Sequence, residues 1–90
     1  MTINVLVRHG RYTNEVFTSA PLTEKAKFEE IVAALKAKNF AVEVNEFELL
    51  GLIALTVTKL RSDAASQYAT DIIIRAGRRA GFSFLSTTHK

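Results

Sequence analysis

Residues 40–60 read FAVEVNEFELLGLIALTVTKL. Apolar and other side chains alternate in two runs, residues 40–47 and 52–60, with Leu49, Leu50 and Gly51 between them. A period of two is typical of a strand with one buried face, and a glycine between two such runs is typical of a hairpin turn. This stretch therefore predicts a β-hairpin.

A helix is predicted on each side of the hairpin. Apolar residues recur at helical spacing over 28–35, after Thr23 as a candidate cap, and Asn39 suits a left-handed end. The same spacing over 65–76 follows the candidate caps Ser62 and Asp63, with Gly81 as the expected C-terminal residue. Gly77 inside this second helix costs up to about 1 kcal/mol relative to alanine, so we expect a weakened last turn.

Strands at 2–8 and 82–87 complete the predicted order β-α-β-β-α-β, and residues 9–22 are predicted to form a long loop because they are rich in turn residues. Right-handed crossovers place both helices on one face of the sheet. The predicted fold is a single α+β domain over residues 1–90, a two-layer ferredoxin-like sandwich with a four-stranded antiparallel sheet. Its core face is expected to hold Ile3, Val5, Val7, Val42, Val44, Ile53, Leu55 and Val57.

Composition excludes several kinds of site and partner. The chain has no cysteine and two histidines, so neither disulfides nor a metal site is expected, and no motif indicates a cofactor. The sequence contains no apolar run of the roughly 18 residues that a membrane span requires. The first residues lack the features of a signal peptide. We therefore expect a cytoplasmic protein with no membrane partner.

Apolar residues are expected where no helix covers them. The open face of the sheet should carry Asn4, Leu6, Ala41, Phe47, Leu52, Ala54, Thr56 and Thr58, and Leu49 and Leu50 lie at the hairpin tip. A contiguous apolar patch usually marks a partner surface; the alternative is a tip that folds back over the core beneath loop 9–22. We expect a non-catalytic assembly module that contacts itself or another protein through Phe47, Leu49, Leu50 and Leu52.

Positive charge collects near the C-terminus. The formal net charge is +3, and residues 72–90 contain Arg75, Arg78, Arg79 and Lys90 but no acidic residue. Arginines near a helix C-terminus complement the helix dipole, which explains them without any ligand. The alternative function is nucleic-acid binding, with Arg75, Arg78 and Arg79 contacting backbone phosphates.

A short motif suggests a second alternative. Residues 5–10 read VLVRHG, Asn14 follows, and Pro21, Leu22 and Thr23 open the first predicted helix. Over this stretch the chain resembles the start of the histidine phosphatases, the phosphoglycerate mutase-like superfamily. The resemblance implies that His9 would accept a phosphoryl group and that Arg8 would bind it. Arg11 stands where the family commonly has Glu or Asp, and no second histidine or phosphate-binding arginine occurs in a matching motif.

Overall fold

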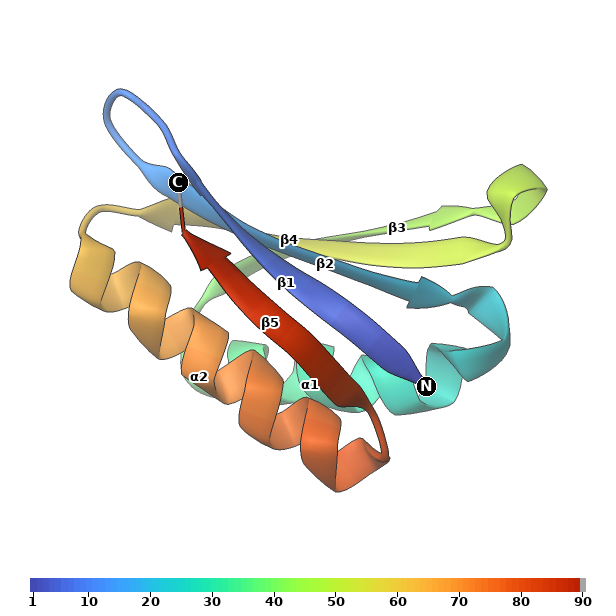
Figure 1. The fold of residues 1–90 in the computed structure, drawn as a ribbon. Helices are drawn as coiled ribbons and strands as arrows, with labels where there is room; N and C mark the ends of the chain where they lie inside the picture. The colour runs from blue at the N-terminus through green and yellow to red at the C-terminus, as the bar shows by residue number, and fades with distance from the viewer. Residues whose placement is uncertain (90) are drawn as a thin grey trace.

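The computed structural model describes the backbone of residues 1–89 and the side chains of residues 1–85. It is an α+β fold in which two helices cover one face of a five-stranded mixed sheet (Figure 1). The strands follow the order β3-β4-β2-β1-β5 across the sheet. The elements are β1 (Thr2–His9), β2 (Asn14–Pro21), α1 (Lys25–Ala37), β3 (Ala41–Phe47), β4 (Leu52–Leu60), α2 (Asp63–Ala80) and β5 (Ser83–His89).

Most of the predicted loop 9–22 is instead the strand β2, which residues 10–13 connect to β1. Residues of β2 pair with β1 on one side and with β4 on the other, so this strand lies in the middle of the sheet. Val16, Thr18 and Ala20 are buried and alternate with more exposed neighbours. The Thr18 hydroxyl donates to the backbone oxygen of Asn4 at 2.6 Å, which satisfies the polar group inside the core. Tertiary pairing thus outweighs the turn preference of threonine, serine and proline in this segment.

The additional strand changes the sheet from antiparallel to mixed. β1 lies between β2 and β5, antiparallel to the first and parallel to the second. The remaining elements, from β2 to β5, keep the predicted order β-α-β-β-α-β. The structure is therefore compatible with the predicted ferredoxin-like sandwich but has one strand more.

The core lies between the sheet and the helices. Six of the predicted core-face residues are buried there: Ile3, Val5, Val7, Ile53, Leu55 and Val57. The prediction holds only in part for β3, since Val42 is half-buried and packs against the core but Val44 is 38% exposed. β3 is an edge strand, and most of it extends past the cover that α1 provides.

The predicted ends of the second helix are confirmed. The Ser62 hydroxyl accepts a hydrogen bond from the backbone N–H of Ala65 at 3.0 Å, and Gly81 has the left-handed φ of 108°. Asn39, with a φ of 66°, ends the first helix in the same way. Thr23 does not act as a side-chain cap, because the chain enters α1 through a short 3-10 helix, η1 (Leu22–Glu24).

Gly77 allows a close approach between α2 and β5. The helix continues past it to Ala80. A Cβ at position 77 would lie 2.5 Å from Cζ of Phe84 and 2.8 Å from its Cε2. The absence of a side chain at Gly77 therefore provides the space for the Phe84 ring.

Replacing Gly77 with alanine should destabilise the protein. The intrinsic helix preference favours alanine by about 1 kcal/mol, but overpacking against Phe84 costs about 1–3 kcal/mol and should dominate. Urea unfolding should give a lower free energy of unfolding for Gly77→Ala than for wild type. Phe84→Leu should reduce this difference when the two changes are combined. A more stable Gly77→Ala protein would contradict the packing argument.

Candidate functional site

Figure 1 shows that no helix covers the second face of the sheet. The centre of this face is apolar. Leu6 of β1 pairs with Phe17 of β2, and both are partly exposed on this face. Leu85 of β5 is 76% exposed. The ion pair between Arg8 Nη2 and Glu15 Oε1, 2.6 Å apart, balances two of the charges at one end of the face. This pair leaves no net charge at that end of the face.

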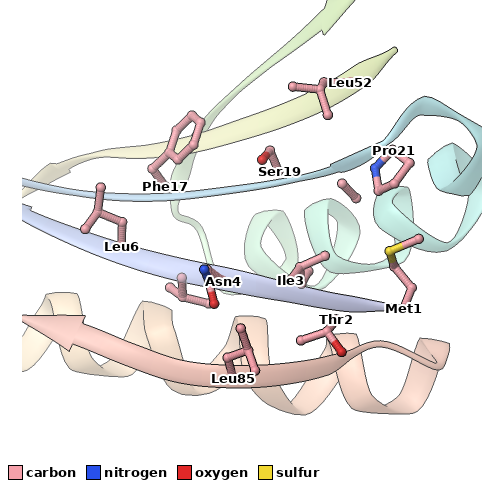
Figure 2. Close-up of a pocket in the computed structure, with 12 residues that line it drawn as sticks. Met1, Thr2, Ile3, Asn4, Leu6, Phe17, Ser19, Pro21, Leu52 and Leu85 are labelled. Carbon is pink, nitrogen blue, oxygen red and sulfur yellow. The ribbon is translucent and has the colours of Figure 1, made fainter. Parts of the chain in front are cut away.

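An open hollow of about 500 Å³ lies on this face at the end where the N-terminus is located (Figure 2). Asn4 and Ser19 contribute polar groups to it, and most of the other side chains are apolar. Its apolar side chains include Met1, Leu6, Phe17, Pro21, Leu52 and Leu85. The hollow is thus a shallow apolar depression framed by β1, β2, β4 and β5.

The hairpin tip next to this hollow exposes two leucines. Leu49 is 103% exposed and Leu50 is 71% exposed, in the short 3-10 helix η2 (Glu48–Leu50). Phe47, 46% exposed, pairs with Leu52, which in turn pairs with Pro21 at the rim of the hollow. The alternative in which the tip folds back over the core is wrong, because both leucines face solvent and the segment expected to cover them is β2.

Two contacts anchor the hairpin to the start of the first helix. The backbone N–H of Leu22 donates to the carbonyl of Gly51 at 2.7 Å. Lys25 Nζ lies 2.8 Å from Glu46 Oε2, and this hydrogen bond and charge raise the pKa of Lys25 above its ordinary value of 10.5. With a raised pKa in the folded state, the contribution of the pair is present below pH 10.5 and is lost as the pH rises through the folded-state pKa.

Part of the uncovered face could not be read from the sequence. Phe17 lies in the segment that the turn residues predict to be a loop, and only the alternation of Val16, Thr18 and Ala20 with their neighbours indicates a strand there. Leu85 lies in a predicted strand, but its face depends on the pairing of β5 with β1. Of the four predicted contact residues, Phe47, Leu49 and Leu50 lie at the tip, and Leu52 lines the hollow.

The residues of the phosphatase-like motif form an antiparallel hairpin. His9 pairs with Asn14 across the turn that joins β1 and β2. His9 Nδ1 lies 3.5 Å from Asp63 Oδ1, and the Arg8 guanidinium donates to Glu15 at 2.6 and 3.1 Å. Both proposed phosphate-handling side chains therefore face a carboxylate within the chain.

Asn14 joins this hairpin to the second helix. Its Nδ2 donates to Asp63 Oδ1 and to Ser66 Oγ, each at 3.1 Å, and the residue is buried. Within the described side chains, no group of three or more histidine, aspartate or glutamate residues could hold a metal ion. Over the same part of the chain, neither helix is long and apolar enough to cross a membrane.

The three arginines of α2 line two adjoining hollows that share Arg75. Arg75 and Arg79 line a groove of about 500 Å³ between α1 and α2, together with Lys38 and Tyr68. Arg78 instead lines a neighbouring hollow with Arg75 and Asp71. Among the described side chains, none of the ion pairs involves any of these arginines. Lys90 lies outside the residues that the structure describes.

Substitutions at Asn14 and at His9 should lower the free energy of unfolding by different amounts. Asn14→Ala removes two hydrogen bonds at a buried position, so the free energy of unfolding should fall by about 1–3 kcal/mol. His9→Ala removes only an exposed pair and should cost less than about 1 kcal/mol. Denaturant unfolding of both variants measures the difference. Equal losses would show that His9 is as important to the fold as Asn14.

Comparison with protein-family models, with curated proteins and with solved structures finds no match to this chain.

Proposed function

We propose that this protein is a non-catalytic assembly module that associates with a second copy of itself through the uncovered face of the sheet. The observation that carries this proposal is the position of the exposed leucines of the hairpin tip beside an apolar hollow on that face. A two-fold contact uses the same patch on both subunits, so the patch must be complementary to itself. A protruding group and a depression on one surface meet this requirement.

The low charge of the face favours a second copy as the partner. Two copies of a strongly charged surface would repel each other, whereas Arg8 and Glu15 neutralise each other here. Glu43 of the edge strand and Glu48 of the tip are exposed, and neither is part of an ion pair among the described side chains. Neither of them lines the hollow itself.

The energetic contribution of the tip would come from burial of its leucines. Fully burying one exposed leucine contributes about 1.5–3 kcal/mol. In a two-fold arrangement each tip enters the hollow of the partner, so the contribution occurs twice. The contacts from Gly51 to Leu22 and from Glu46 to Lys25 hold the tip in place beforehand, which lowers the entropy lost on association.

A charge at the tip should abolish association. Wild type should have a molar mass near twice the 10.0 kDa of the chain, at low and at high salt, by light scattering on a sizing column. Leu50→Asp should give a folded monomer, because Leu50 is exposed and its replacement removes no core contact. Tyr12→Asp is the matched control, since Tyr12 is 84% exposed in the β1–β2 turn, away from the hollow.

Two results would overturn the proposal. A wild-type protein that remains a 10.0 kDa monomer at every concentration excludes self-association and leaves a different protein as the partner of this face. A dimer that persists in both Leu50→Asp and Phe17→Asp places the interface elsewhere on the molecule. Circular dichroism of each variant shows whether the fold is retained.

A further inference from the structure

A groove with three cations lies on the helical side of the molecule, opposite the proposed interface. Arg75 and Arg79 are four residues apart on α2 and so share one helix face. Lys38, directly after α1, faces them from the other helix. Ala34 and Ile72 are the small and apolar parts of the lining. Among the side chains that the structure describes, no carboxylate lines the groove.

The positive charge of the groove is not neutralised by a neighbouring side chain. Among the described side chains, Lys38, Arg75 and Arg79 have no carboxylate within ion-pair distance. Asp71, one turn before Arg75, accepts a hydrogen bond from Gln67 Nε2 at 2.9 Å and lines the neighbouring hollow. The helix dipole accounts for cations in the last turn, where Arg78 and Arg79 lie, but Arg75 precedes that turn.

The groove also presents an aromatic ring. Tyr68 is 44% exposed and lines the groove at the end nearest Lys38. Its ring lies 5.6 Å from that of Phe40, tilted by 58°, so one side of the tyrosine is supported by packing. Proteins that bind single-stranded nucleic acids combine aromatic rings, on which the bases stack, with positive charges that contact the phosphates.

We propose that this groove binds a nucleotide, with the base against Tyr68 and the phosphate between Arg75 and Arg79. Lys38 would add positive charge at the Tyr68 end of the same groove. A volume of about 500 Å³ is within the usual range for small-molecule sites. The same chemistry would accept a free nucleotide or one unit of a single-stranded nucleic acid. The proposal does not depend on self-association, because the two surfaces lie on opposite sides of the sheet.

Binding can be measured with two probes at low salt. The first is a fluorescent single-stranded DNA of about 12 nucleotides, a length within the known site sizes for such grooves, followed by anisotropy. The second is adenosine monophosphate, followed by calorimetry. Saturable binding of the monophosphate identifies a free nucleotide as the ligand. Binding of the strand alone identifies single-stranded nucleic acid. Either result supports the groove, provided that the variants below respond.

Matched substitutions assign the binding to the groove. Arg75→Gln should weaken binding of the probe and reduce the slope of log affinity against log salt by about one. Arg11→Gln changes the net charge equally at an exposed position in the β1–β2 turn and should have little effect. Tyr68→Ala should weaken binding about fivefold or more, Tyr68→Phe should keep it, and Tyr12→Ala should leave it unchanged.

The proposal fails if neither probe binds at low salt. It also fails if Arg11→Gln weakens binding as much as Arg75→Gln, because the attraction would then come from net charge alone. Tyr68 packs against Phe40, so Tyr68→Ala can lower stability. Arg75→Gln still tests the proposal in that case, because Arg75 is exposed and its replacement removes no core contact.

Discussion

The pairing of β2 between β1 and β4 is the constraint on which the rest of the structure depends. This strand joins the N-terminal hairpin to the β3–β4 hairpin and places buried Val16 and Thr18 at the centre of the sheet. Both helices then follow crossovers between parallel strands, from β2 to β3 and from β4 to β5. Right-handed crossovers put both helices on one face, so the opposite face has no cover within the chain.

The two sides of the molecule consequently have different chemistry. The uncovered side offers apolar side chains and little net charge, which suits contact with a similar surface. The helical side offers a groove with Lys38, Arg75 and Arg79 beside Tyr68, which suits an anion with an aromatic ring. Since the sheet separates them, one surface can be occupied without blocking the other.

Contacts with distant parts of the chain explain why Gly77 and Asn14 occur at their positions. Gly77 is unfavourable in a helix, yet it provides the space that the Phe84 ring occupies. Asn14 lies in a motif that resembles a catalytic sequence, yet its amide is used to join β2 to Asp63 and Ser66 of α2. Both residues were noticeable in the sequence, but their partners are distant along the chain.

The sequence by itself determined both helices, four of the strands, the Ser62 cap, the left-handed ends at Asn39 and Gly81, and most of the core. These features depend on local spacing and on the preferences of single residues. Only the tertiary structure decided that residues 14–21 form the central strand, that Val44 is left exposed at an edge, and that Arg75 and Arg79 share a groove with Lys38 while Arg78 does not. The reason is physical: strand pairing and groove formation depend on contacts between distant segments, and these contacts outweigh local preferences.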